Sequence, residues 1–142
     1  LLRLTQATDY GIAAILFLSQ RDTDRNYSIG EISRKTEITE KFLKKVFQVL
    51  VRSGIIVSFK GRGGGVTLAR SPQDITVAEI ITPLQEEVGL VRCLRAREYC
   101  PRSNGCRASV FWRRIQENLF EVLGKTTIKD VLEGGNENAG QS

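Results

Sequence analysis

The chain has 142 residues, of which 41% are hydrophobic, so it can bury one core and hardly two. Its 21 Lys and Arg residues outnumber its 16 Asp and Glu residues, and the formal net charge of +5 favours an acidic partner, either nucleic acid or an anionic membrane surface. The longest apolar run, Ile12 to Leu18, is far shorter than the roughly 20 residues that a membrane-spanning helix needs. We therefore expect no signal peptide, no membrane segment and a cytoplasmic location.

The first third of the chain predicts three short helices. Apolar residues recur at helical spacing from Thr8 to Ser19. Ser28 and Glu31 form a capping-box pattern, in which each side chain satisfies a free amide of the first turn, and the helix they begin ends near Lys35. Thr39 can cap a third helix after a tight turn. Two short helices joined by a tight turn indicate a helix-turn-helix.

The third predicted helix has two chemically different faces. One face has the spacing of a helix packed on a core and consists of Leu43, Val46, Phe47 and Leu50. The opposite face carries Lys41, Lys44, Lys45, Gln48 and Arg52. A charged face is usually just solvated surface, but the second helix of a helix-turn-helix lies in the major groove of DNA, so its basic face favours DNA recognition. Gly54 predicts the end of this helix.

A β-hairpin is predicted directly after the basic helix. The β-branched runs Ile55–Phe59 and Val66–Ala69 flank the glycine-rich segment Lys60–Gly65, which is typical of two strands with a flexible basic tip. A hairpin in this position is a wing, so the sequence predicts a winged helix-turn-helix. We expect base edges or phosphates to be contacted by Thr39, Lys41, Lys44 and Lys45 of the recognition helix and by Lys60 and Arg62 of the wing.

The rest of the chain predicts three further helices. Thr76 and Glu79 repeat the capping-box pattern before a short helix that Pro83 kinks or ends. A longer helix begins near Ala108 and ends at Gly124, and its apolar stripe consists of Phe111, Ile115, Leu119 and Val122. So long a stripe needs a partner. A brief last helix is predicted from Thr127 to Glu133.

Three cysteines lie in one short stretch with the spacing C-x6-C-x5-C: Cys93, Cys100 and Cys106. An odd number cannot form a closed set of disulfides within one chain, and thiolates bind soft or borderline metals. Structural zinc normally uses more closely spaced cysteine pairs, and the chain has no histidine for a mixed site, so an iron–sulfur cluster is favoured. The alternative is three unrelated thiols, some of them buried as small apolar residues.

Several segments together resemble the Rrf-type family of winged-helix transcription regulators, which has IscR-like, NsrR-like, RirA-like and CymR-like members. They are Arg3-Leu4-Thr5, Thr8-Asp9-Tyr10, the wing Lys60–Gly65, the three cysteines and Thr127–Leu132. The resemblance covers Arg3 to about Glu133 and is closest to the iron–sulfur-binding members. It implies a homodimer on double-stranded operator DNA, with long helices crossing between the protomers and a cluster near their interface.

The expected fold is mainly α with a small β-hairpin. We divide the chain into a winged helix-turn-helix domain (1–84), a cysteine-bearing loop (85–107), a dimerisation helix with a short terminal helix (108–133) and a disordered tail (134–142). The cluster is expected to be [2Fe-2S] rather than [4Fe-4S]. The resemblance implies control of genes for iron–sulfur cluster assembly, iron, or redox and nitric-oxide stress.

The fourth cluster ligand departs from part of the family. IscR-like members place a histidine three residues after the last cysteine, where this chain has Ser109. NsrR-like members use an aspartate from the partner protomer, and Asp9 stands at the matching position. An aspartate there also suits the dipole of a helix N-terminus. Glu98, Ser109 or a small exogenous molecule are the other candidates.

The DNA-contacting residues also depart from the IscR-like pattern. Lys44 replaces the glutamate expected in the recognition helix, and Lys60 replaces the arginine expected in the wing.

The alternative function is a cluster-free repressor that responds to thiol oxidation or to a metabolite, as CymR-like members do. An iron–sulfur enzyme is disfavoured, because no histidine, acid–base pair or cofactor loop accompanies the cysteines.

Overall fold

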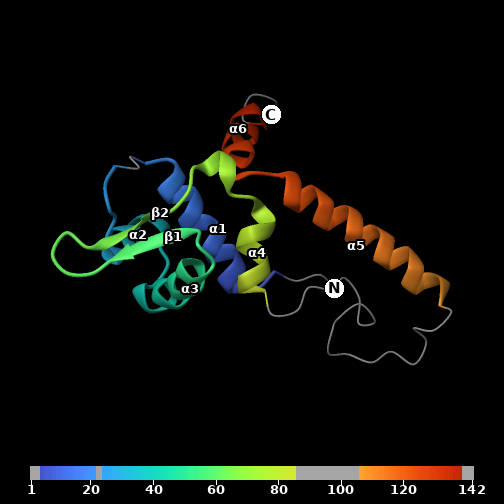
Figure 1. The fold of residues 1–142 in the computed structure, drawn as a ribbon, viewed down its shortest axis with the longest axis horizontal. Helices are drawn as coiled ribbons and strands as arrows, with labels where there is room; N and C mark the ends of the chain where they lie inside the picture. Colours follow the sequence, from blue (N-terminus) through green and yellow to red (C-terminus); the bar gives the residue numbers. More distant parts are fainter. Residues whose placement is uncertain (1–3, 22–23, 86–105, 139–142) are drawn as a thin grey trace.

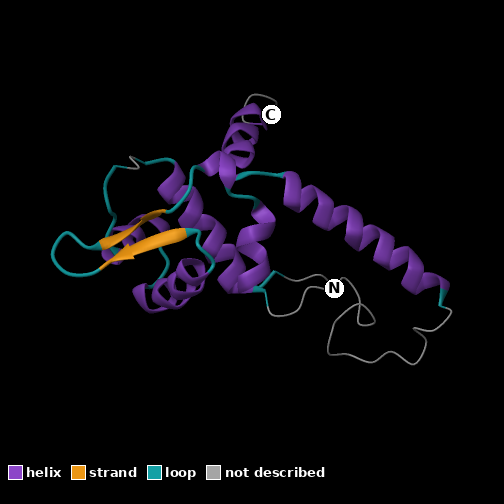
Figure 2. Cartoon of the chain, viewed as in Figure 1, coloured by secondary structure: helices purple, strands orange, loops and turns teal. Residues whose placement is uncertain are grey.

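The computed structural model describes residues 4–21, 24–85 and 106–138. Its elements are α1 (Gln6–Ser19), α2 (Ile29–Thr36), α3 (Glu40–Arg52), β1 (Ile56–Phe59), β2 (Gly65–Leu68), a short 3-10 helix η1 (Pro72–Asp74), α4 (Val77–Leu84), α5 (Arg107–Lys125) and α6 (Ile128–Asn138). Figure 2 shows that helices predominate and that β1 and β2 form one antiparallel hairpin. This confirms the predicted fold class. No helix within the described ranges combines the length and hydropathy needed to cross a membrane.

Helices α1 to α4 and the hairpin form one body, and α5 extends away from it as a rod (Figure 1). The hairpin projects from the side of the body opposite to α5. After α5, two backbone hydrogen bonds join the chain to the body again. The Val77 amide donates to the Thr126 carbonyl (2.8 Å), and the Ile128 amide donates to the Ile75 carbonyl (2.9 Å). These bonds hold the end of α5 beside the start of α4.

The predicted helix caps are present, and they explain most of the boundaries. Capping boxes formed by Ser28 with Glu31 and by Thr76 with Glu79 begin α2 and α4. Thr39 caps α3, and Gly54 follows its end with a φ of 74°, a left-handed conformation that glycine adopts without strain. Helix α4 ends one residue after Pro83, as that proline predicts.

Two helix boundaries differ from the predicted ones by two residues or more. Helix α1 begins at Gln6 rather than Thr8, because the Thr5 hydroxyl accepts a hydrogen bond from the Thr8 amide at 3.2 Å and caps the helix earlier. Helix α6 continues to Asn138, so the predicted disordered tail is wrong for residues 134–138. Gly134 lowers helix propensity but does not force a helix to end.

The core lies between α1, α3, α4 and the hairpin, and Ile128 of α6 completes it with no exposed surface. Helices α1 and α4 approach closely at Gly11, where an added Cβ would lie 2.4 Å from Cδ1 of Leu84. A buried polar network joins the same two helices at their ends. Oε1 of Gln85 accepts hydrogen bonds from the Thr5 amide (3.1 Å) and the Thr8 hydroxyl (3.0 Å). The start of α1 and the end of α4 are therefore fixed together.

The capping boxes predict how stability depends on pH. The hydrogen bond from the Thr76 amide lowers the pKa of Glu79 below its ordinary value of 4.5, and the ion pair with Arg70 acts in the same direction. A lowered folded-state pKa stabilises the fold above pH 4.5, and this contribution disappears as the pH falls through the lowered pKa.

We therefore expect Glu79→Gln to lower the thermal unfolding midpoint at neutral pH, and the difference from the parent chain to vanish in acid. Calorimetry across the pH range measures both. The control is Glu117→Gln on the exposed part of α5. A midpoint difference for Glu79→Gln that stays constant into acid would contradict this account.

Candidate DNA interface and metal-ligating residues

Helix α3 presents its basic face to solvent because its apolar face is packed into the core. Its buried side chains, none more than 4% exposed, are Leu43, Val46, Phe47 and Leu50. The exposed residues opposite them are Lys41, Lys44, Lys45, Gln48 and Arg52. The Thr39 hydroxyl accepts a hydrogen bond from the Phe42 amide at 3.3 Å and keeps its own proton as a donor. Thr39 and the three lysines thus lie along the first half of one exposed helix face.

The predicted wing residues lie at the exposed tip of the hairpin. The last paired residues of the two strands are Phe59 and Gly65, and Lys60 and Arg62 lie in the turn beyond them, both exposed. Gly61 has a φ of 90°, a backbone conformation that glycine adopts readily and other residues do not. The tip therefore needs glycines for its shape, and its cations are accessible to a DNA backbone.

The segment just before α2 pairs with the wing and holds it in place. The Tyr27 amide donates to the Val66 carbonyl at 2.9 Å, and the Val66 amide donates to the Tyr27 carbonyl at 2.8 Å. Gly65 permits this approach, because a Cβ on it would lie 2.3 Å from the Tyr27 carbonyl oxygen. The Asn26 side chain also donates to the Gly63 carbonyl at 3.3 Å. These contacts hold the wing in a fixed position relative to α2.

A groove of about 380 Å³ lies between α3 and the wing. Its lining residues are Ile29, Lys44, Phe47, Gln48, Val51, Arg52, Ser58 and Val66. Of the six predicted DNA-contacting residues, only Lys44 lines it. Gln48 and Arg52 belong to the predicted basic face but not to the predicted contact set. Ser58 was missed entirely, because a strand serine gives no sign in the sequence of which face it lies on. These three polar residues join the candidate interface.

The predicted metal-ligating residues are only partly within the described residues, since Cys93, Glu98 and Cys100 lie outside them. Cys106 is the N-cap residue of α5, is partly exposed, and makes no side-chain capping hydrogen bond. Ser109, in the first turn of α5, is only 4% exposed. Asp9 lies in the exposed first turn of α1. Among residues 4–21, 24–85 and 106–138, no three potential metal ligands form a group.

A helix-turn-helix whose second helix exposes a basic face, followed by a basic hairpin fixed beside it, defines a winged helix-turn-helix DNA-binding protein. Residues 4–134 match the model of the Rrf2 family, described as an iron-dependent transcriptional regulator. The chain belongs to the Rrf2 family of DNA-binding transcription regulators, as the resemblance predicted. Membership in a family of regulators also agrees with the prediction that the chain is not an enzyme.

The curated relatives and the solved structures support the same family. Protein Aau3 of Rhizobium meliloti is 30% identical over 132 residues, which cover 92% of this chain and 85% of that protein. The regulator IscR of Yersinia pestis is 28% identical over 131 residues, which cover 92% of this chain and 79% of that protein. The structure of CymR, the global cysteine regulator of B. subtilis, has a TM-score of 0.73 at 25% identity, covering 92% of this chain and 96% of CymR. The structure of T. potens IscR has a TM-score of 0.75 at 26% identity, with 96% and 90% covered. Because the likeness extends to both IscR and CymR, it establishes the family and not the subtype.

Proposed function

We propose that this chain is a homodimeric regulator that binds operator DNA through α3 and the wing, and that an iron–sulfur cluster on Cys93, Cys100 and Cys106 sets its DNA affinity. The observation that carries the proposal lies in one helix. Cys106 is the N-cap of α5, and the same helix has an apolar stripe that no other described residue covers. A change at the cluster therefore acts on the helix that joins two DNA-binding domains. The cluster shifts the DNA affinity because its binding free energy differs between two relative placements of the DNA-binding domains.

The dimer is supported by the exposure of apolar side chains along α5. The large apolar residues that are 38% to 67% exposed on this helix are Val110, Phe111, Trp112, Ile115 and Val122. A row of large exposed apolar residues on one helix marks an interaction surface rather than scattered surface residues. A second copy of α5 offers the matching apolar surface, as a two-fold dimer requires.

We expect Ile115→Glu to convert the dimer into a monomer, because each interface would then bury two unpaired carboxylates. Sedimentation velocity measures the mass at several protein concentrations, and the parent chain should have twice the chain mass of 15.9 kDa. Arg113→Glu, which also introduces a carboxylate into α5 but at an exposed position on the side of the helix opposite to Ile115, is the control and should remain dimeric. A parent chain that is monomeric at all concentrations would refute the dimer.

The DNA-contacting residues divide into two groups by position. Lys44 lies in the groove between α3 and the wing, where a recognition helix meets base edges. Lys60 lies at the wing tip, where an ammonium group can pair with any phosphate. We propose that Lys44 contributes sequence preference and that Lys60 contributes affinity common to all sequences.

We expect Lys44→Ala to reduce the preference for the selected operator over random duplex DNA. Lys60→Ala should weaken binding to the operator and to random DNA about equally. It should also reduce the slope of log K against the logarithm of the salt concentration by about 1. Fluorescence anisotropy with an operator enriched from a random duplex library measures both quantities at several salt concentrations. Lys129→Ala, on α6, removes one charge away from the groove and the wing and serves as the control. Equal losses on random DNA for Lys44→Ala and Lys60→Ala would contradict base recognition by Lys44.

The described part of the cluster site fits a thiolate-bound cluster. Cys106 is partly exposed and its Sγ caps no amide, while the free amides of the first turn of α5 favour negative charge nearby. Asp9 is exposed and has no hydrogen bond or ion pair through its carboxylate with another described residue. This favours Asp9 of the partner protomer as the fourth ligand, whereas Ser109 is almost completely buried. The bound cluster, [2Fe-2S] in this proposal, supplies a redox- and iron-sensitive group.

We expect Cys106→Ala to lose the visible chromophore and the bound iron while remaining a folded dimer, because the side chain plays no part in capping α5. Iron and sulfide analysis of anaerobically purified protein should give about two of each per parent chain for a [2Fe-2S] cluster. Ser109→Ala should retain the cluster, and Asp9→Ala should make it more labile. A Cys106→Ala variant with the full iron content of the parent chain would disprove the ligand set.

The second candidate function is a cluster-free regulator that responds to thiol oxidation or to a metabolite. The observations that favour it are the fold shared with CymR and the serine at the position where IscR-like members have a histidine ligand. A parent chain that is colourless and free of iron, and stays so after anaerobic reconstitution, would support this function over the cluster.

A further inference from the structure

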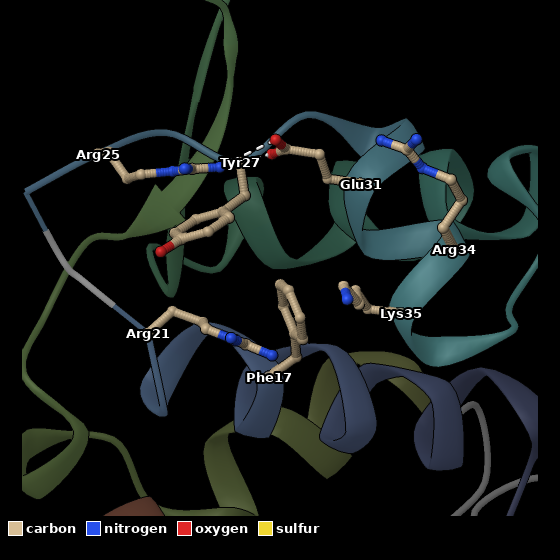
Figure 3. Close-up of a pocket in the computed structure, with 7 residues that line it drawn as sticks. All are labelled: Phe17, Arg21, Arg25, Tyr27, Glu31, Arg34 and Lys35. Atoms are coloured by element: carbon tan, nitrogen blue, oxygen red, sulfur yellow. Dashed lines mark hydrogen bonds and ion pairs between the residues drawn. The ribbon is translucent and has the colours of Figure 1, made fainter.

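A pocket of about 480 Å³ lies between the end of α1, the segment before α2 and α2 itself (Figure 3). Its lining residues are Phe17, Arg21, Arg25, Tyr27, Glu31, Arg34 and Lys35. The volume lies within the range of about 300–1,000 Å³ that is usual for small-molecule sites. It shares no lining residue with the groove between α3 and the wing. The pocket is therefore separate from the candidate DNA interface.

The pocket carries an excess of positive charge, since four cationic side chains and one carboxylate line it. That carboxylate, on Glu31, is already engaged, because it accepts two hydrogen bonds from Nη2 of Arg25 at 2.9 and 3.0 Å and one from the Ser28 amide at 3.2 Å. Within the described part of the chain, none of the other three cations, Arg21, Arg34 and Lys35, forms an ion pair with a carboxylate. The pocket thus has cations to offer an incoming anion.

Two aromatic rings form the apolar part of the pocket and hold two of the cations in place. Phe17 and Tyr27 meet edge to face, with ring centroids 5.7 Å apart. The Arg21 guanidinium lies 5.0 Å from the centre of the Phe17 ring, and the Arg25 guanidinium lies 4.3 Å from that of Tyr27. Figure 3 shows the ends of the Arg21 and Lys35 side chains on either side of Phe17. An anion can therefore bind cations that are largely oriented before it arrives.

We propose that this pocket binds a small organic anion, a carboxylate or phosphate that also carries a planar apolar group. The cationic side chains bind the acidic group of the ligand, and Phe17 and Tyr27 pack against its apolar group. The site also has a direct connection to the wing, because Tyr27, which lines the pocket, is hydrogen-bonded through its backbone to Val66 of β2. The inference rests on the described lining residues of the pocket and does not depend on the iron–sulfur cluster.

The test uses the full chain, labelled with ¹⁵N and titrated with phenyl phosphate at constant ionic strength. Benzyl alcohol, which lacks the charge, and inorganic phosphate, which lacks the ring, are titrated in parallel. The pocket variant is Arg21→Gln/Lys35→Gln. The matched control is Lys125→Gln/Lys129→Gln, which removes the same charge from α5 and α6. Lys35→Gln alone is the second pocket variant if the double variant has a lower thermal midpoint than the control.

The expected result is a saturable shift of the backbone amide signals of residues 17–35 with phenyl phosphate, and weaker effects of both reference compounds. The apparent Kd should rise about tenfold or more in the pocket variant, as expected for the loss of a charged hydrogen bond, and should not change in the control. Shifts that never saturate, or that fall equally in both variants, would show only screening of surface charge and overturn the proposal. It is also overturned if random duplex DNA and inorganic phosphate move the same signals more strongly than phenyl phosphate, because the pocket would then be a backbone contact of DNA.

Discussion

The burial of one face of α3 determines what the opposite face can do. Leu43 and Leu50, seven residues apart, have no exposed surface, and the helix cannot rotate about its axis without bringing these leucines into water. The basic side chains are therefore held outward by apolar packing, and none of them has a hydrogen bond or ion pair to another described residue. The wing is fixed by a different kind of force. Two short backbone hydrogen bonds between Tyr27 and Val66 set its position, and Gly65 makes room for them.

Local sequence patterns predicted the described α-helices, the two strands and most of their ends, because capping is a short-range interaction, but not the short 3-10 helix η1. Ser28 with Glu31 and Thr76 with Glu79 are three residues apart, and each pair forms the reciprocal bonds that its pattern predicts. The cap at Thr5 was missed, although the same rule applies, because the apolar periodicity starts later. The pairing of Tyr27 with Val66 joins residues far apart in the sequence, and no local pattern could have predicted it.

The candidate site likewise has features that local sequence patterns predict and features that depend on tertiary packing. The identity of the basic residues on α3 and at the wing tip was readable from helical spacing and from glycines around a turn. The groove that Lys44 shares with Arg52 and Ser58 depends on how α3 packs against β1, which is a tertiary relation. Cysteine spacing predicted thiolate chemistry, but neither the position of Cys106 as the N-cap of α5 nor the burial of Ser109 follows from it. The cationic pocket was not predicted, because its residues come from two helices and the segment between them.

The way α5 is attached separates the positions that can vary from those that the core needs. The buried Ser109 of α5 is not part of the hydrophobic core, whereas Leu123 near the end of α5 packs partly buried against it. Ile128, just beyond α5, is completely buried in that core and is hydrogen-bonded to Ile75. The chain thus rejoins the DNA-binding body at Leu123 and is anchored to it at Ile128. The exposed part of α5, from Val110 to Val122, can therefore change its side chains without repacking that core. One DNA-reading unit can in this way be combined with many different sensors, provided that the attachment at Ile75 and Ile128 is kept.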